Sequence, residues 1–148
     1  MRIAILGAGA WGTALAISLG RRHRVALWGR DATLVQAVAR ERRNQRYLPG
    51  HDLPQNVAVE ADLARAVESA ELILVVTPAS GLRVVCTQLQ QIDSSAALIW
   101  ACKGFEADSA QLPHSVVAEA APRFAQRGVL SGPSFAQEVA AGKPAALT

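Results

Sequence analysis

Short apolar runs alternate with longer segments of helical periodicity along the whole chain. The apolar runs have the length of β-strands and lie at residues 2–6, 25–28, 57–60, 72–76, 97–102 and 128–132. The longer segments repeat apolar residues every three or four positions and lie at residues 11–22, 31–43, 61–70, 80–92, 111–121 and 135–142. Strands that are apolar throughout are buried on both faces, as in a parallel sheet covered by helices. The alternation therefore predicts an α/β fold with a doubly wound, mostly parallel sheet and helices on both faces.

One segment, residues 44–56 with the sequence NQRYLPGHDLPQN, interrupts this alternation. It is rich in Pro, Gly and Asn, which predicts an irregular loop over the edge of the sheet. The sequence contains no internal repeat, low-complexity tract or interdomain linker. We therefore expect residues 1–148 to form one domain, long enough to bury about 70% of its unfolded surface in a single core.

The sequence GAGAWG at residues 7–12 follows the first strand directly and opens the first helix. In that context the pattern G-x-G-x-x-G is typical of a dinucleotide-binding turn in a Rossmann-type fold. Gly7 would make the tight turn, Gly9 would let a diphosphate approach the backbone, and Gly12 would let helix and strand pack closely. Free amide groups and the positive end of the helix dipole would then face the anion. The alternative is that the glycines serve only a sharp turn between strand and helix.

The same opening stretch also resembles a secretion signal, because Met-Arg precedes an apolar run with small residues at 14–16. A signal sequence has no need of glycines at 7, 9 and 12, and a second strand follows at 25–28. These features favour the nucleotide-binding interpretation. No later segment reaches ~18 consecutive apolar residues, so no membrane span is expected.

Two residues after the second strand bear on the choice of cofactor. An acidic residue at this place selects NAD by binding the adenine ribose, whereas an arginine accommodates the additional phosphate of NADP. Arg30 is nearest the strand end and suggests that NADP is accepted, without excluding NAD. Asp31 stands at the spacing of an NAD-type acid, but it also precedes a helix, and we favour an N-capping role for it.

Charge and cysteine content restrict the other candidate functions. The formal net charge of +3 comes mostly from arginine clusters at residues 21–24 and 40–46, which suit solvated helix ends better than an anionic partner. These clusters lack the interleaved aromatics and recognition helix of a nucleic-acid-binding protein. Cys86 and Cys102 show no metal-binding or redox spacing, and the three histidines are scattered, so no metal site is predicted. Free, buried cysteines in a reducing cytoplasm are the expectation.

Several short stretches together resemble one family. They occur in the order GAGAWGTALA, LWGRD, YLP, VTPAS, WACKGFE and SGPSFAQEVAAGKP. This order is similar to that of the bacterial NAD(P)-dependent glycerol-3-phosphate dehydrogenases, and the resemblance covers essentially all of the chain. The Lys-Gly after the fifth strand, combined with Ser-Gly-Pro-x-Phe-Ala-x-Glu, is much more specific than the glycine turn alone.

The resemblance implies roles for individual residues in binding the cofactor and the substrate. Besides the three glycines, it implies dinucleotide contacts from Ala10, Trp11, Arg30, Tyr47, Pro78, Lys103 and Ala136. It implies substrate contacts from Lys103, Gly132 and Ser134. The reaction would move a hydride between the nicotinamide of NAD or NADP and C2 of dihydroxyacetone phosphate or sn-glycerol 3-phosphate, for phospholipid synthesis.

The chain also departs from the family, whose enzymes run to more than twice this length. Their helical second domain carries the proton-transfer lysine and an arginine that grips the substrate phosphate. We therefore expect residues 1–148 to be the dinucleotide-binding half, cytoplasmic and without a catalytic residue of its own, with negligible turnover alone and a possible homodimer in the full-length form. The alternatives are a non-catalytic dinucleotide-binding module and another reductase, such as one similar to ketopantoate reductase or a 3-hydroxyacyl dehydrogenase.

Overall fold

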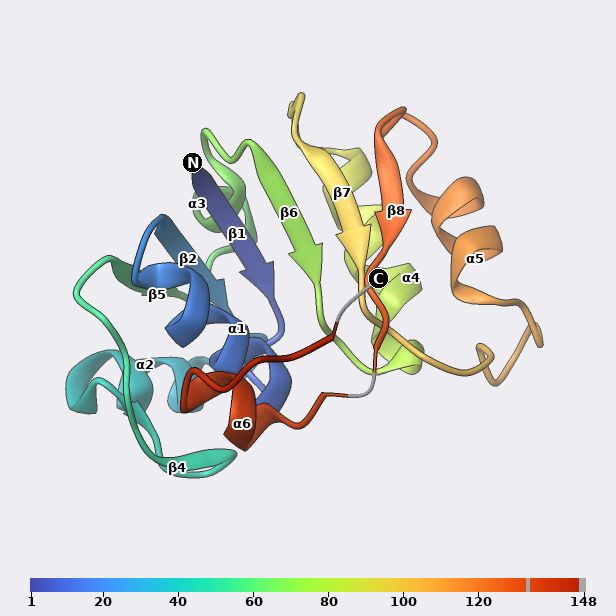
Figure 1. The fold of residues 1–148 in the computed structure, drawn as a ribbon. Coiled ribbons are helices and arrows are strands. Elements are labelled where there is room, and N and C mark those ends of the chain that lie inside the picture. The colour runs from blue at the N-terminus through green and yellow to red at the C-terminus, as the bar shows by residue number, and fades with distance from the viewer. Residues whose placement is uncertain (133, 147–148) are drawn as a thin grey trace.

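A six-stranded sheet forms the centre of the molecule (Figure 1). The computed structural model describes residues 1–132 and 134–146. The strand order is β5-β2-β1-β6-β7-β8, and every neighbouring pair is parallel. The strands are β1 (Arg2–Leu6), β2 (Arg24–Trp28), β5 (Val57–Glu60), β6 (Leu72–Val75), β7 (Ala97–Trp100) and β8 (Arg127–Val129). The chain winds outward from β1 in one direction and from β6 in the other, which confirms the predicted doubly wound sheet.

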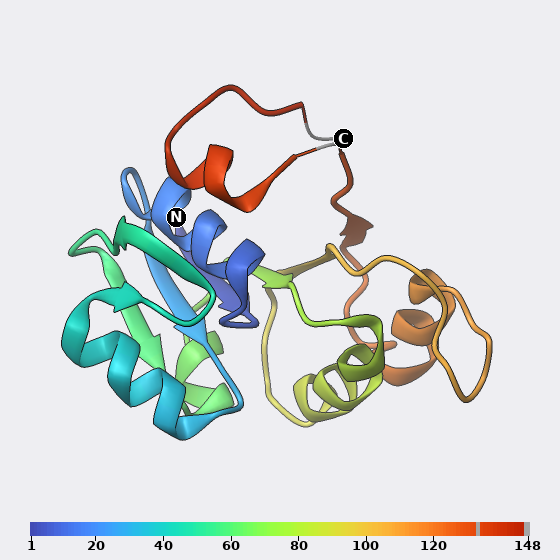
Figure 2. The same ribbon diagram turned by 90° about the horizontal axis from the view of Figure 1, so that it is seen from below.

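Helices cover both faces of this sheet. They are α1 (Ala10–Gly20), α2 (Ala32–Glu41), α3 (Leu63–Val67), α4 (Ala79–Gln90), α5 (Pro113–Ala120) and α6 (Ala136–Ala140). Ile3 and Ile5 of β1 belong to a core shared with α1 and α6, whereas Ala4 and Leu6 belong to a core shared with α3, α4 and α5. Successive side chains of a strand point to opposite faces, so β1 is buried on both. Figure 2 shows α1 and α6 on one side of the sheet and α4 on the other.

Helix α1 is buried around most of its circumference, which explains its nearly uncharged sequence. Its buried residues run from Gly12 to Ile17 and include Gly20. One side of α1 packs on the sheet and the other lies beneath α6. A helix covered on opposite sides needs no polar face. The apolar opening of the chain is thus core structure, formed by β1 and α1.

The prediction of an irregular loop over residues 44–56 is wrong. Two short antiparallel strands, β3 (Arg43–Asn44) and β4 (Leu48–Asp52), form a hairpin in this segment. Leu48 and Leu53 are buried in the core that contains α1, and Arg43 pairs with Asp52 across the hairpin. Tertiary burial of two leucines and one cross-strand ion pair therefore order a segment whose Pro, Gly and Asn content suggests a loop.

The segment 31–43 is helical only as far as Glu41 because Arg42 has a left-handed backbone conformation, with φ of 54°. From this position the Arg42 guanidinium donates hydrogen bonds to the carbonyl oxygens of Pro54 and Val57, at 2.5 and 2.8 Å. These bonds tie the end of α2 to the start of β5. The interruption of the predicted helix is therefore stabilised by side-chain contacts that local periodicity does not reveal.

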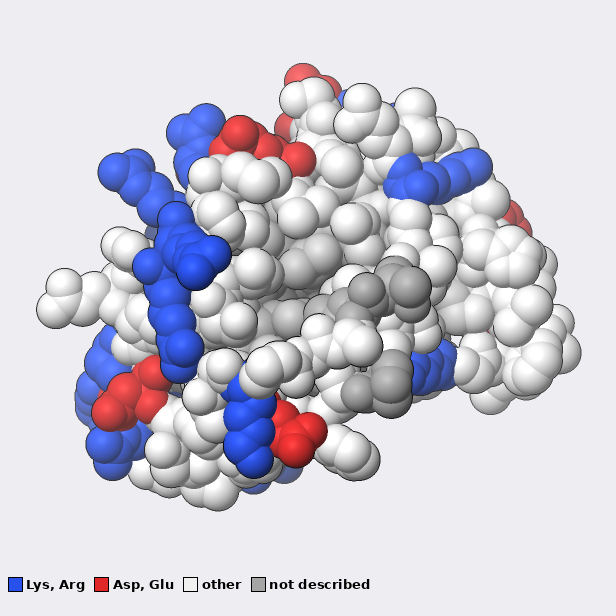
Figure 3. Space-filling model, in the orientation of Figure 1, with Lys and Arg blue, Asp and Glu red and all other residues white. Residues whose placement is uncertain are grey.

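Most arginines of the two clusters take part in the fold. Arg21 donates to the carbonyl of Ala140 at 3.1 Å, and Arg46 pairs with Asp31 at 3.4 Å. Arg40, Arg42 and Arg43 also have partners within the chain. Figure 3 shows the lysine and arginine side chains of the displayed face in several separate groups, most of them toward its left and lower parts, with acidic side chains beside some of them. These arginines thus act mainly as structural groups at helix and strand ends.

Both cysteines are free and buried, as expected. Burial raises the pKa of the Cys86 thiol to about 12, and it also raises the pKa of Cys102. The Cys102 Sγ donates to the carbonyl of Thr77 at 3.0 Å, which ties the segments following β7 and β6 together. Neither thiol is therefore a nucleophile at neutral pH. Over residues 1–132 and 134–146, no helix is long and apolar enough to cross a bilayer.

Candidate functional site

The predicted site residues gather at the carboxyl edge of the sheet. The direction of winding reverses between β1 and β6, which places a crevice outside the ends of these two strands. The amide of Gly7 donates to the Trp28 carbonyl at 2.9 Å, and the amide of Val76 donates to the Leu6 carbonyl at 2.8 Å. The turns that follow β1, β2 and β6 are therefore held side by side at the crevice.

The three glycines of the first turn meet very different surroundings. Gly7 has φ of +133°, and a Cβ there would lie 2.7 Å from the carbonyl oxygen of Val76. A Cβ on Gly12 would overlap the carbonyl oxygen of Gly7. At Gly9, in contrast, no atom of the described residues beyond its own chain neighbours lies within 4 Å of the Cβ position. Gly7 and Gly12 are thus required by the packing of the turn, whereas the absence of a side chain at Gly9 keeps a space open.

The electrostatics of this turn fit an anion. Gly9 is the N-cap of α1 and makes no side-chain capping bond, no other described side chain caps the helix, and its first turn has no acidic residue. The first amides of a helix, including those of Ala10 and Trp11, have no intrahelical acceptor and carry the positive end of the helix dipole. The open space at Gly9 and these donors form a cradle suited to the diphosphate of NAD or NADP.

At the end of β2, Arg30 and Asp31 play different structural parts. Asp31 is the N-cap of α2, where its Oδ1 accepts from the Leu34 amide at 3.1 Å, so the capping interpretation is confirmed. Arg30 is exposed and has no hydrogen bond or ion pair to other residues of the described chain. Arg46 pairs with Asp31 and stacks on Tyr47, 5.1 Å from the ring centroid. The hairpin thereby places Tyr47 next to the segment that carries Arg30.

Lys103 and Gly132 come together although they lie on different connections. The Nζ of Lys103 donates to the carbonyl of Gly132 at 3.4 Å. Together with Trp11 of the glycine turn, these residues line a small hollow that also includes Ala101, Leu130 and Ser131. Within the described ranges no acidic side chain pairs with Lys103. A cation is therefore available beside the first turn of α1.

Ser134 has a buried hydroxyl. Its Oγ is inaccessible and forms no hydrogen bond with the described residues. Buried hydroxyl groups are normally paired, so a hydroxyl without a partner among the described residues is suited to binding a polar ligand. Gly132 and Ser134 flank residue 133, which lies outside the described part of the chain.

Pro78 and Ala136 each stand at the start of a helix. Pro78 is the N-cap of α4 and is exposed at the carboxyl end of β6, on the crevice. Ala136 is the first residue of α6 and packs against the core that contains α1. The structure thus brings the predicted positions to one edge of the sheet, on the turn, on the hairpin and on the connections after β6, β7 and β8.

Sequence reasoning missed an ion-pair network that holds the connection following Lys103. Arg83 of α4 donates to both oxygens of Glu106, with Nε–Oε1 at 2.9 Å and Nη2–Oε2 at 2.8 Å. The same guanidinium donates to Gln111 at 2.7 Å and approaches Glu119 at 3.3 Å. Such bidentate pairing fixes geometry as well as charge. The spacing of these residues contains no signal for the network, because it joins segments more than twenty positions apart.

We expect Glu106→Gln to reduce the acid sensitivity of the fold. The Arg83 guanidinium lowers the pKa of Glu106 below its ordinary value, so the pair stabilises the fold above that value and is lost as pH falls through the lowered pKa. The variant should therefore melt at a lower temperature than the wild type at neutral pH, with the difference shrinking below about pH 4. Thermal melts between pH 3 and 7 measure this. Glu119→Gln is the control, because its contact is longer and more exposed; equal effects of both variants would contradict the prediction.

Asn44 is a second residue that sequence reasoning missed. It lies on β3, its side chain is fully buried, and it contacts the glycine turn. Its position inside a Pro- and Gly-rich segment suggests a solvent-exposed turn residue instead. Only the hairpin, which was not predicted, brings it to the turn.

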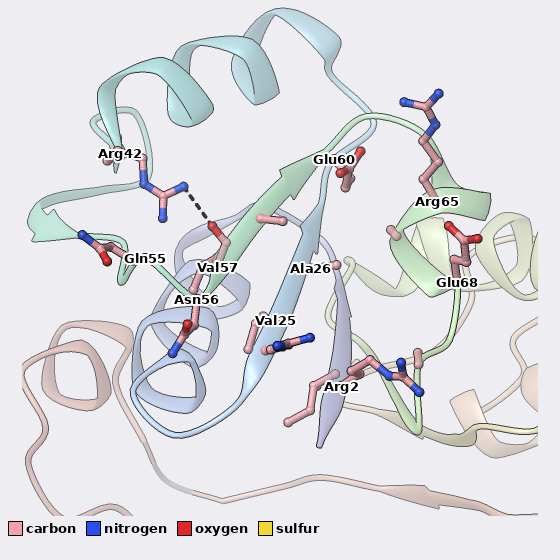
Figure 4. A pocket seen from close by; sticks show the side chains of 15 residues that line it. Arg2, Val25, Ala26, Arg42, Gln55, Asn56, Val57, Glu60, Arg65 and Glu68 are labelled. Atoms are coloured by element: carbon pink, nitrogen blue, oxygen red, sulfur yellow. Dashed lines mark hydrogen bonds between the residues drawn. The ribbon is translucent and has the colours of Figure 1, made fainter.

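A hollow of about 600 Å³ lies elsewhere on the sheet (Figure 4). It is lined by residues of β1, β2, β5 and α3, among them Arg2, Ala26, Glu60 and Arg65. None of the predicted site residues lines it. Its size therefore does not identify it as the dinucleotide site, which the glycine turn and the helix dipole place at the carboxyl edge.

Comparison with known proteins decides the family. Residues 2–148 match the family profile described as "NAD-dependent glycerol-3-phosphate dehydrogenase N-terminus". The chain belongs to this family. A curated relative from Aromatoleum aromaticum, "Glycerol-3-phosphate dehydrogenase [NAD(P)+]", is 53% identical over all 148 residues. One from Nitrosomonas europaea with the same name is 55% identical. The chain spans 45% of the length of each of these glycerol-3-phosphate dehydrogenases.

Solved structures agree with this assignment. The crystal structure of glycerol-3-phosphate dehydrogenase from Coxiella burnetii superimposes with a TM-score of 0.89 at 39% identity, over 99% of this chain and 45% of that one. A ketopantoate reductase from Ralstonia eutropha reaches a TM-score of 0.65 at 22% identity, over 91% of this chain and 42% of that one, which shows a shared fold alone. The family of the chain is therefore that of the glycerol-3-phosphate dehydrogenases, whose cofactor is NAD or NADP.

Proposed function

We propose that the chain holds NADP or NAD at the carboxyl edge of its sheet and forms the dinucleotide-binding part of an sn-glycerol-3-phosphate dehydrogenase. The observation that carries the proposal is the open position at Gly9, at the head of an uncapped α1, beside a hollow that Trp11 shares with Lys103 and Gly132. The first amides of α1, including those of Ala10 and Trp11, would hold the diphosphate. The nicotinamide supplies the hydride chemistry when it is bound.

Residues around the small hollow bind and orient the substrate. The ammonium group of Lys103 attracts the phosphate of dihydroxyacetone phosphate or polarises its carbonyl, because it is a compact point charge without an acidic partner among the described residues. The Ser134 hydroxyl donates to a substrate oxygen, which satisfies a group that is otherwise buried without a partner. Pro78 would lie near the nicotinamide, Tyr47 near the adenine, and Ala136 near the cofactor.

A chimera tests the proposal. Residues 1–148 would replace the matching 45% of the Aromatoleum relative, with which they share 53% identity. We expect the chimera to oxidise NADPH in the presence of dihydroxyacetone phosphate, and the 148-residue chain alone to bind NADPH in a calorimetric titration with negligible turnover. Binding without turnover in a folded chimera would favour a non-catalytic dinucleotide-binding module, and absence of binding would overturn the whole proposal. Gel filtration of the chimera tests the expected homodimer, and cell fractionation tests the expected cytoplasmic location.

Arg30→Asp is expected to lower the preference for NADPH over NADH by about tenfold or more. The exposed guanidinium at the end of β2 pairs with the additional phosphate of NADPH, and a carboxylate there repels it while accepting from the ribose hydroxyls of NADH. Titrations of both dinucleotides give the ratio of dissociation constants. Arg22→Asp makes the same change of charge beside the amino end of β1, away from the crevice, and should leave the ratio unchanged. A ratio unaffected by Arg30→Asp would remove this residue from the site.

A further inference from the structure

The side chain of Asn44 makes hydrogen bonds with three parts of the structure. Its Nδ2 donates to the Ala8 carbonyl at 2.9 Å and to the Thr13 hydroxyl at 2.8 Å. Its Oδ1 accepts from the Tyr47 amide at 3.2 Å. The side chains of Asn44 and Thr13 are both fully buried. An amide has two N–H donors, so both donors are used, and the side chain is fixed in one orientation.

The hydrogen bond from Asn44 to the Ala8 carbonyl involves the Ala8–Gly9 peptide, which leads into the open position at Gly9. Ala8 lies between Gly7 and Gly9, and the peptide joining Ala8 to Gly9 is trans. The carbonyl and the N–H of a trans peptide point in opposite directions within one plane. When Asn44 holds the Ala8 carbonyl toward the hairpin, it therefore directs the Gly9 N–H to the opposite side of the turn.

The remaining bonds connect this peptide to its surroundings. The Thr13 amide donates to the Gly9 carbonyl at 3.0 Å, which closes the first turn of α1, and the Thr13 hydroxyl accepts from Asn44. Asn44 thus links the turn, the start of α1 and the hairpin that carries Tyr47. A hydrogen bond in such a water-excluded place is stronger than at the surface, and its donor cannot be replaced by water.

We propose that Asn44 is a positioning residue of the dinucleotide site, which orients the Ala8–Gly9 peptide so that the Gly9 N–H donates to the cofactor diphosphate. The inference rests on the proposed function and adds to it a residue outside the glycine turn. It makes the hairpin a part of the site. The carboxamide is required as a donor rather than as a filler of space, which separates this role from a purely structural one.

Asn44→Asp removes the donor and keeps the shape of the side chain, and Asn44→Ala removes the donor without adding a charge beside the diphosphate. Aspartate has nearly the same shape. The oxygen in the place of Oδ1 still accepts from the Tyr47 amide, and the Thr13 hydroxyl can rotate to donate to the oxygen in the place of Nδ2. The lost contact is the one to the Ala8 carbonyl, which would then face a carboxylate oxygen. We expect the dissociation constant for NADPH to rise by about tenfold, measured by calorimetric titration below the melting temperature of the variant.

Thr13→Val is the matched control, because it removes the other acceptor of the same Asn44 amide and keeps the bond to Ala8. It should lower the melting temperature while changing the NADPH dissociation constant by less than about threefold. Asn44→Ala buries no charge, so its weaker binding of NADPH, expected to be of similar size, reports the loss of the donor and not repulsion of the diphosphate. If the variants weaken binding only in proportion to their loss of stability, or if Asn44→Ala binds NADPH as tightly as the wild type, the positioning role is overturned. A wild type that binds no NADPH overturns the proposed function itself.

Discussion

Gly12→Ala should lower the melting temperature by about 10 °C and abolish dinucleotide binding. A methyl group at this position overlaps the carbonyl oxygen of Gly7, which is backbone and can move only if the turn opens. Overpacking of this kind costs about 3 kcal/mol, and in a chain of 148 residues each kcal/mol shifts the melting temperature by roughly 2–4 °C. Thermal melts followed by circular dichroism, together with an NADPH titration, measure both effects.

Gly9→Ala is the informative comparison for Gly12→Ala. The added methyl group would enter open space, because no atom of the described residues beyond the chain neighbours of Gly9 lies within 4 Å of its position. The melting temperature should therefore stay within about 2 °C of the wild type. The methyl would nevertheless stand where the diphosphate approaches the backbone, and we expect NADPH binding to weaken by at least about tenfold. Intact affinity in Gly9→Ala would move the cofactor away from this turn. Unchanged stability in Gly12→Ala would contradict the close packing.

The parts of the fold that depend on local periodicity could be predicted from the sequence. The run Arg2–Leu6 is apolar after its first residue because both faces of β1 are buried, and the glycine pattern follows it without a gap. Parallel strands bring their carboxyl ends to one edge, so the proximity of the segments after β6, β7 and β8 follows from the strand order. The contact between Lys103 and Gly132 is an instance, formed by residues 29 positions apart.

The parts that depend on tertiary partners could not be predicted in this way. Asn44 is buried only because the hairpin folds against α1, and its acceptors lie 36 and 31 positions earlier in the chain. Arg42 ends α2 through bonds to carbonyls on the way into β5, although the helical periodicity continues past it. Arg83 of α4 pairs with Glu106, which lies in the connection after β7. In each case a polar side chain forms hydrogen bonds with groups that are distant in the sequence, whereas composition alone suggests that such a side chain is exposed to solvent.

Lys103→Ala is expected to lower kcat/KM for dihydroxyacetone phosphate by about 10²–10³-fold in the chimera with the Aromatoleum relative. The Lys103 ammonium is exposed at the hollow next to Trp11, and its contact among the described residues is a carbonyl, so its charge is available to the substrate. Removing a preorganised charge from a developing oxyanion or a phosphate costs rate to this extent. Steady-state NADPH oxidation gives kcat and KM separately.

Two comparisons show whether the effect belongs to the ammonium group at that place. Lys103→Arg keeps the charge but spreads it over a planar guanidinium, so it should recover only part of the lost rate. Arg127→Ala removes one positive charge at the start of β8, on the opposite edge of the sheet, and should leave kcat/KM unchanged. The Arg83–Glu106 contact holds the connection that follows Lys103, so disturbing that contact should lower the same rate without removing the lysine. Normal turnover by a folded Lys103→Ala chimera would mean that the substrate phosphate and carbonyl are held entirely by other groups.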